Sequence, residues 1–111
     1  MEHKSLAGGG WNKLSFFEQM ANIGSEVERA LKWKSKNNQE YADLALNRAL
    51  ELIDLTVADE RNKNRLSEIL RTRETLADFY FGNNDYRTSA IQLQKYFFSF
   101  NFAARATVAG F

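Results

Sequence analysis

The sequence predicts an all-α protein, arranged as an antiparallel up-down-up-down four-helix bundle. Three observations lead to this fold class. The 111 residues contain no proline, so no position forbids a long helix. Apolar side chains recur at spacings of three and four residues in four successive segments, which is the period of one helix face. The connections between these segments are short and polar, which favours antiparallel neighbours. We therefore expect one bundle domain over residues 15–111.

Composition places the chain among ordinary globular domains. Hydrophobic residues make up 44% and charged residues 26%, and the net charge of +1 gives no general attraction to nucleic acid or anionic membranes. The absence of cysteine excludes disulfides and thiolate chemistry. No apolar run is long enough to cross a bilayer, and no secretory signal is visible. A cytoplasmic protein without a membrane partner is therefore expected.

Residues 1–14 are expected to lie outside the folded domain. Their first part, MEHKSLAGGG, looks either flexible or added for expression. The single histidine, His3, falls in this segment. Without cysteine or a further histidine, residues 15–111 lack the usual zinc ligands and the commonest general base. We therefore expect no catalytic residue, no metal and no cofactor.

The first helix is predicted to begin at Ser15. Ser15 and Glu18 have the spacing of a capping box, in which each side chain accepts a hydrogen bond from the other's backbone N–H. The apolar face that follows comprises Phe16, Met20, Ile23, Val27, Ala30 and Leu31. Gly24 lies at its edge and costs a helix about 1 kcal/mol relative to alanine. We therefore expect a neighbouring helix to approach closely at Gly24.

The second and third helices are separated by a polar stretch. The second begins at Asn37 or Asn38, and its wide apolar face predicts more than one neighbour. Residues 58–64, ADERNKN, read as a polar turn without an apolar anchor. The third helix runs from about residue 64 to residue 81, and Gly82 is expected to end it in a left-handed cap. The residues expected to point inward from this helix are Leu66, Ile69, Leu70, Leu76, Ala77 and Tyr80.

The fourth helix has two apolar faces. One comprises Ala90, Leu93, Phe97, Phe100, Ala104 and Val108, and the second lies about half a turn away at about 100° per residue. A helix in a four-helix monomer can turn only one face to the core, so we expect the second face to bind a partner. Deeper burial in an irregular bundle is the alternative. The predicted partner interface consists of Ile91, Phe98, Phe102 and Ala106.

Arg73 lies within the apolar stripe of the third helix. A buried guanidinium needs a carboxylate, a set of carbonyls or a wet cleft. The structural interpretation is an ion pair that sets helix register, or a side chain that reaches solvent from the end of the stripe. The functional interpretation is an anion site between helices. The carboxylates within reach on neighbouring helices are Glu26, Glu28, Asp43 and Asp54.

A basic and aromatic cluster ends the first helix. Its members are Arg29, Lys32, Trp33, Lys34 and Lys36. Such a cluster can hold single-stranded nucleic acid by phosphate contacts and base stacking. The alternative is a solvated helix end whose positive charge complements the helix dipole, with Trp33 packed on a loop or a neighbouring subunit.

Four antiparallel helices in about a hundred residues resemble HEPN domains, small helical proteins that accompany nucleotidyltransferases or act as toxin ribonucleases. The resemblance covers residues 15–111 in helix order alone. HEPN nucleases carry a histidine four to six residues after an arginine, and Arg71, Arg73 and Arg105 lack it. The resemblance therefore implies a non-nucleolytic member that dimerises and binds.

Together these patterns predict a non-enzymatic helical interaction module that self-associates as a homodimer and binds a protein partner. The alternative is an RNA-binding or RNA-processing accessory protein that uses the basic and aromatic surface.

Overall fold

The computed structural model describes residues 9–108, with side chains for residues 9–106. These residues form helices and connecting turns without any strand, which confirms the all-α fold class. In chain order the elements are η2 (Trp11–Lys13), α1 (Phe16–Ser35), α2 (Gln39–Ala58), η3 (Glu60–Arg65), α3 (Leu66–Phe81) and α4 (Ala90–Val108), where η marks a 3-10 helix.

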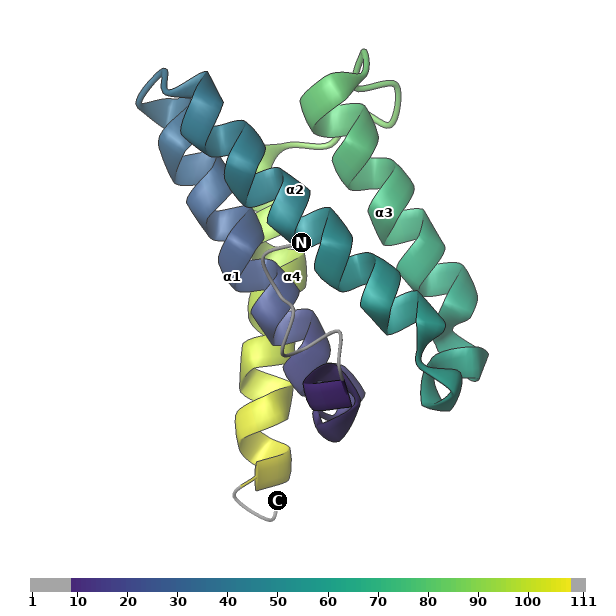
Figure 1. Ribbon diagram of the computed structural model, residues 1–111. Helices are drawn as coiled ribbons and strands as arrows, with labels where there is room; N and C mark the ends of the chain where they lie inside the picture. Colours follow the sequence, from purple (N-terminus) through teal and green to yellow (C-terminus); the bar gives the residue numbers. More distant parts are fainter. Residues whose placement is uncertain (1–8, 109–111) are drawn as a thin grey trace.

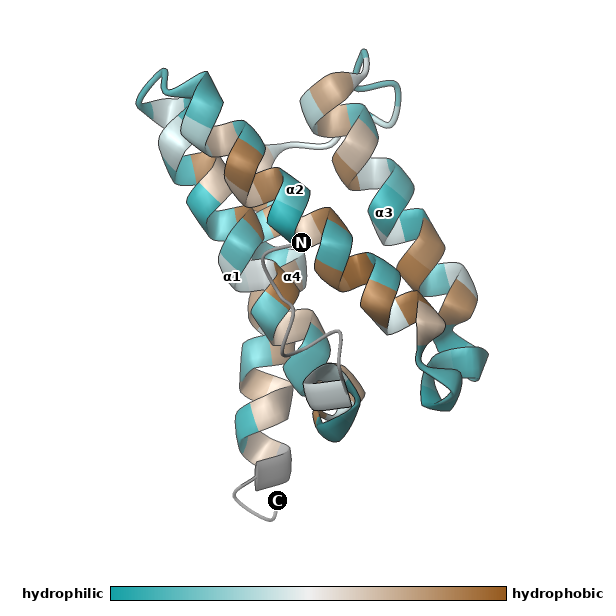
Figure 2. Cartoon of the chain, in the orientation of Figure 1, coloured by the Kyte–Doolittle hydropathy of each residue, from teal (hydrophilic) through white to brown (hydrophobic). Residues whose placement is uncertain are grey.

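Helices α1 and α2 form the centre of the molecule. They run antiparallel, side by side, and share the most extensive helix contact (Figure 1). The predicted capping box opens α1, where Ser15 Oγ accepts from Glu18 N at 3.1 Å and Glu18 Oε1 accepts from Ser15 N at 2.9 Å. Asn38 opens α2 by accepting from Tyr41 N at 3.0 Å, which decides between the two predicted starting residues. Figure 2 shows hydrophobic residues recurring along α2 between hydrophilic ones.

The other two helices flank this pair. Helix α4 packs along α1, and α3 packs more loosely against α2 (Figure 1). Contacts between α3 and α4 are sparse and include a hydrogen bond from Tyr96 Oη to Glu68 Oε2 at 2.8 Å. The coarse all-α architecture is thus established, whereas the closed up-down-up-down bundle stays a prediction.

Helix α4 meets α1 at Gly24, as the sequence predicted for a neighbouring helix. A Cβ atom placed on Gly24 would lie 2.8 Å from Phe97 Cβ, closer than carbon atoms pack. Phe97 Cβ is bonded directly to the backbone of α4, so the crowding cannot be relieved by turning a side chain. The absent side chain at Gly24 therefore sets how closely α1 and α4 approach.

The core extends further toward the N-terminus than predicted. Trp11 is 1% exposed and donates from Nε1 to Thr56 Oγ1 of α2 at 2.9 Å. The prediction that residues 1–14 lie outside the fold is therefore wrong for residues 11–14, because a glycine-rich run is no guide to the residues that follow it. Residues 1–8, for which flexibility was predicted, lie outside the described residues.

The polar turn predicted at residues 58–64 is a folded part of the domain. It contains the 3-10 helix η3, and Asp59 and Asn62 are buried within it. Polar composition alone predicted exposure, but here the polar groups find partners inside the protein. As a result α3 begins at Leu66, slightly later than expected.

The inward face of α3 also differs from the prediction. Ile69 and Leu76 are buried, but Leu66 and Leu70 are exposed, whereas Thr72 is 8% exposed. Because α3 packs loosely, only part of its apolar stripe meets another helix.

Gly82 ends α3 in an extended conformation, with φ −98°, rather than in the predicted left-handed cap. The connection to α4 spans residues 82–89 and is longer than expected. Its positive φ angles occur at Asn84 and Arg87 instead. Asp78 accepts from Asp85 N at 2.9 Å and from Tyr86 N at 3.0 Å, so a side chain holds this turn in place of the glycine cap.

Gly24→Ala is expected to lower the free energy of unfolding by about 1–3 kcal/mol, the usual cost of overpacking. The same glycine-to-alanine change at an exposed helix position raises the free energy of unfolding by about 1 kcal/mol. Urea denaturation followed by circular dichroism measures the difference. Asn22→Ala, at an exposed position of the same helix, is the control and should change stability little. A stabilised Gly24→Ala protein would contradict the close contact.

Trp11→Ala is expected to cost about 3–5 kcal/mol of unfolding free energy because it empties a buried site. Trp33→Ala, at a half-buried position, should cost much less. The same denaturation experiment compares them, and Trp11→Phe provides a milder variant if the alanine protein does not fold. Equal losses for the two tryptophans would show that residue 11 is not part of the core.

Candidate functional site

The two faces of α4 have opposite environments. Phe97 is 4% exposed on the inner face, whereas Phe98 is 69% and Phe102 is 72% exposed on the outer face. Ile91 is 62% exposed, and Ala106 is half-buried. We call the four predicted interface residues the α4 outer face. It remains without a covering element among residues 9–106.

Aromatic packing holds the inner face of α4 in place. The ring centroid of Phe100 lies 5.8 Å from that of Phe16 and 5.1 Å from that of Tyr96, both in edge-to-face geometry. The Phe17 ring lies 6.3 Å from Phe100. The contacts with Phe16 and Phe17 tie α4 to the start of α1. They fix the rotation of α4 and thereby determine which residues point outward.

A groove of about 660 Å³ runs between α1 and α4 beside the outer face. Gly24 and Phe97, which bring the two helices together, both line it. Phe98 belongs to both the groove and the outer face. The groove's other lining residues include Ser25, Glu28, Arg29, Lys32, Lys95 and Asn101.

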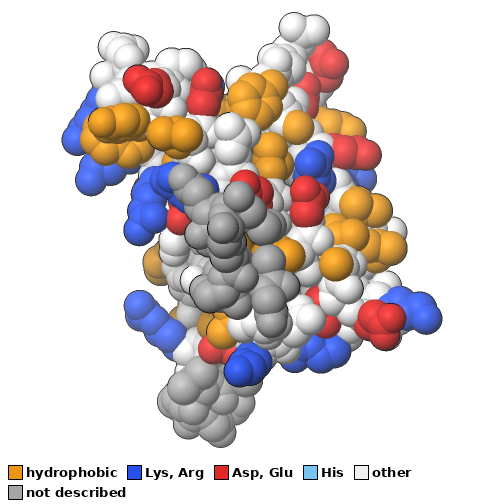
Figure 3. Space-filling view, viewed as in Figure 1, with side chains coloured by type: hydrophobic (Ala, Val, Ile, Leu, Met, Phe, Trp, Pro, Cys, Tyr) orange, Lys and Arg blue, Asp and Glu red, His pale blue; other side chains and the backbone are white. Residues whose placement is uncertain are grey.

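The charge of this groove is mainly positive. Arg29 Nη1 pairs with Glu26 Oε1 at 2.9 Å, but its side chain is still 61% exposed. Lys32 and Lys95 make no ion pair with any carboxylate in the described part of the chain. Glu28 is the one acidic lining residue, and it accepts from Gln94 Nε2 at 3.2 Å. On the face shown in Figure 3, by contrast, acidic and basic side chains are interspersed over α2 and α3.

The predicted nucleic-acid cluster is divided between different surroundings. Arg29 and Lys32 line the groove, whereas the Trp33 ring packs edge-to-face on Tyr41 of α2, with centroids 4.9 Å apart. Lys36 Nζ lies 5.4 Å from the Trp33 ring centroid. Trp33 is thus half-buried by its own chain rather than presented as a free stacking platform.

Lys34 faces α3, in a cleft that Lys32 also lines. Its Nζ lies 4.6 Å from the Phe79 ring centroid and 5.0 Å from that of Tyr80, both on α3. Cation–π contacts of this kind join the end of α1 to the end of α3. Burial, followed by the nearby Glu28 carboxylate, raises the pKa of Tyr80.

Arg73 pairs with Asp54, one of the four carboxylates within its predicted reach. Arg73 Nε donates to Asp54 Oδ1 at 2.9 Å, with the two side chains 40% and 58% exposed. Arg73 is therefore paired but not buried as predicted, because α3 packs only loosely against α2. Glu26 instead pairs with Arg48 Nε at 2.9 Å. Such a surface ion pair contributes about 0–1 kcal/mol and leaves no anion site open.

No known family model, curated protein or solved structure gives a significant match to this chain. The resemblance to HEPN domains therefore stays a prediction.

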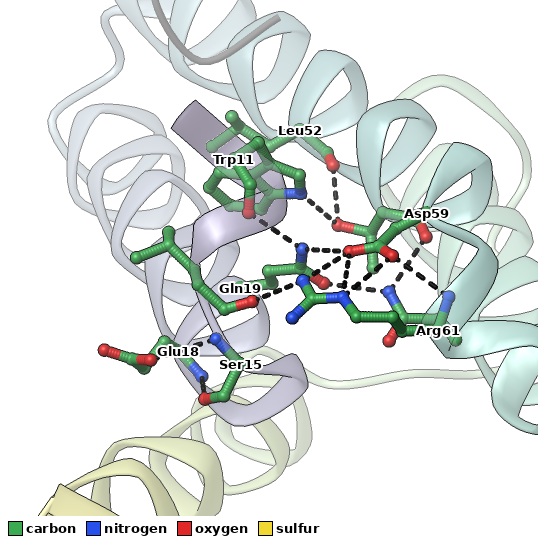
Figure 4. A network of polar contacts seen from close by, with 10 residues as sticks. Trp11, Ser15, Glu18, Gln19, Leu52, Asp59 and Arg61 are labelled. Carbon is green, nitrogen blue, oxygen red and sulfur yellow. Dashed lines mark hydrogen bonds and ion pairs between the residues drawn. The ribbon is translucent and has the colours of Figure 1, made fainter. Parts of the chain in front are cut away.

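A buried polar network joins the N-terminal segment to the end of α2 (Figure 4). Gln19 is fully buried, and its Nε2 donates to Trp11 O at 3.0 Å and to Asp59 Oδ2 at 2.9 Å. Gln19 Oε1 accepts from Asn62 Nδ2 at 2.8 Å. Gln19 precedes Ile23 by one helical turn and so shares the apolar face of α1. This position was the sequence signal that could have predicted the burial of Gln19.

Arg61 closes the network at the surface. Its Nη2 donates to Asp59 Oδ2 at 2.6 Å and to Leu14 O at 2.7 Å (Figure 4). The Arg61 guanidinium, assisted by Gln19, outweighs the opposing effect of burial and lowers the pKa of Asp59 from 3.8 to about 2. Because these groups bind one another, they hold the fold together and offer no open reactive group.

A second cleft, of about 240 Å³, lies between α3 and α4. Tyr96 Oη lies 3.0 Å from Thr72 Oγ1 and donates to Glu68 at its rim. Burial raises the pKa of Tyr96, and the bond to Glu68 adds to that rise. The polar groups of this cleft therefore bridge the loosely packed helices α3 and α4.

Within residues 9–108, none of the helices is both long and apolar enough to cross a membrane. The same residues contain no group of three or more acidic, histidine or cysteine side chains arranged to hold a metal ion.

The lowered pKa of Asp59 predicts an acid-sensitive contribution to stability. The unfolded chain binds a proton at Asp59 more readily than the folded protein does, so the contribution is complete above about pH 5. It should be lost as the pH falls from 3.8 toward about 2. Urea denaturation across this range measures the decline.

Asp59→Asn should flatten that decline and cost about 1.5–3 kcal/mol at neutral pH, because a charged hydrogen-bond acceptor is lost. Asp54→Asn is the matched control, since Asp54 is paired at the surface. An acid decline that is the same in the Asp59→Asn protein would show that Asp59 is not its source.

Proposed function

We propose that this protein is a non-enzymatic helical interaction module that binds another protein chain through the α4 outer face, and that a second copy of the chain covers this face when no other partner is present. The supporting observation is the exposure of Ile91, Phe98 and Phe102, between 62% and 72% each. Large apolar side chains gathered on one helix face usually mark an interface.

The spacing of these residues suits a helical partner. Ile91, Phe98 and Phe102 follow one another at seven and four residues, so they form a strip about 16 Å long on one side of α4. Full burial of each side chain is worth roughly 1.5–3 kcal/mol. Docking a helix along this strip would bury all three together, which fits reversible binding better than permanent assembly.

The remaining parts of the proposal are consistent with this interface. An antiparallel up-down-up-down bundle would place α4 at the periphery, where a partner helix could lie beside it. A non-nucleolytic HEPN-like protein would also be expected to dimerise. Both features belong to the proposal and rest on the sequence.

The RNA-binding alternative has one supporting observation, the presence of Arg29 and Lys32 in the groove next to Phe98. A cationic groove with an exposed ring can hold a single strand. Against it, Trp33 packs on Tyr41 and Lys34 packs on the rings of α3. A protein partner is therefore the better-supported proposal.

Phe98→Glu combined with Phe102→Glu is expected to weaken self-association at least about a hundredfold, because two charges from each copy would have to be desolvated in the interface. Size-exclusion chromatography with light scattering across a concentration series measures this. The unaltered protein should approach twice the monomer mass of 12.8 kDa, and the double variant should remain monomeric with unchanged helicity.

The matched control is Leu44→Glu with Leu70→Glu. These side chains are 45% and 42% exposed on α2 and α3, so the charge change is the same but the α4 outer face is intact. The control should dimerise normally. A protein that is monomeric at every concentration, or a dimer that survives both α4 substitutions, would remove the basis for self-association.

A further inference from the structure

The groove between α1 and α4 carries information about the partner beyond its apolar strip. Its described rim combines the exposed side chain of Arg29 with Lys32 and Lys95, against the single carboxylate of Glu28. Along α4 itself, the charged residues are Lys95 and Arg105, and its sequence from 90 to 108 contains no acidic residue. Apolar and positive groups therefore meet in the lining of this groove.

We infer that this groove receives an acidic amphipathic helix from a partner protein, with apolar side chains against Phe98 and Phe102 and carboxylates toward Lys32 and Lys95. This inference rests on the proposed function, because it assumes that the α4 outer face binds protein. It adds the chemistry of the partner, which the apolar face alone does not specify.

Charge complementarity is the argument for an acidic partner. Lys32 lies on α1 and Lys95 on α4, so positive charge flanks the groove from both helices. Neither lysine pairs with a carboxylate among the residues that the structure describes. A helix with carboxylates on both flanks of its apolar stripe would supply that partner charge, whereas a basic helix would be repelled.

Shape and composition favour a helix over a nucleic-acid strand. Gly24 and Phe97 form an apolar floor, and the exposed ring in the groove is Phe98. Single-stranded nucleic acid requires several stacking rings along its path as well as cations. An amphipathic helix needs apolar anchors at helical spacing beside a groove. Ile91, Phe98 and Phe102 have this spacing on α4, and Phe98 also lines the groove.

The test uses the full chain and fluorescently labelled peptides of about 16 residues, long enough to form about four helical turns. The first peptide has leucine at helical spacing and glutamate elsewhere. In the second peptide every glutamate is replaced by glutamine, and in the third every glutamate is replaced by lysine. A single-stranded oligouridine is the fourth probe. Fluorescence anisotropy is measured across a series of salt concentrations.

The glutamate peptide is expected to bind at least about tenfold more tightly than the glutamine peptide, and the lysine peptide least of all. Lys32→Glu with Lys95→Glu should weaken the binding of the glutamate peptide by at least about tenfold. The matched control, Lys13→Glu with Lys63→Glu, changes two exposed lysines outside the groove and should change binding less than about twofold.

Several results would overturn the inference. Equal affinity for the glutamate and glutamine peptides would remove the role of charge. Equal losses in the two lysine variants would assign binding to net charge rather than to this groove. Tighter binding of oligouridine, lost in the groove variant, would identify the occupant as nucleic acid. If a saturating concentration of the glutamate peptide does not dissociate the dimer, the occupant of the groove is a second copy of the chain.

The two proposals can fail separately. The unaltered protein could dimerise and yet bind the glutamate and glutamine peptides equally. That result would refute the acidic partner but not self-association, which depends on Phe98 and Phe102. A monomeric protein that binds the glutamate peptide refutes self-association and leaves the groove assignment standing.

Discussion

The close approach of α4 to α1 at Gly24 is the constraint from which the surface of this protein follows. Because Gly24 has no side chain, Phe97 of α4 can approach it closely. An alanine Cβ at residue 24 would lie 2.8 Å from Phe97 Cβ. The helices thus meet almost backbone to backbone at this point. The groove opens beside this contact, with Gly24 and Phe97 in its lining.

This contact also determines the rotation of α4. Once Phe97 and Phe100 face α1, the residues on the opposite side of the helix must face outward, because 100° per residue separates the two sets by about half a turn. Phe98 and Phe102 are consequently exposed. The exposed face is therefore a geometric consequence of how tightly the inner face packs.

Near the start of α1, buried polar groups connect the chain in addition to the apolar core. Gln19 and Asp59 are buried, yet each has several hydrogen-bond partners, so their burial does not leave charge or polarity uncompensated. Through Trp11, this network brings the segment before α1 into the core. The start of α1 is thus held by a specific polar arrangement, and its contact with α4 borders an apolar and positive groove.

The sequence by itself determined the helical fold class, the capping box at Ser15, the significance of Gly24 and the two-sided character of α4. Each of these depends on local spacing, which a linear pattern records directly. It could not show that Trp11 and the polar residues after α2 are buried, because their partners lie 40 or more residues away in the chain. Similarly, the tertiary structure alone paired Arg73 with Asp54, separated Trp33 from Arg29 and Lys32, and brought those two cations beside Phe98. Helix periodicity tells which residues share a face, whereas only the packing of one helix on another decides what that face meets.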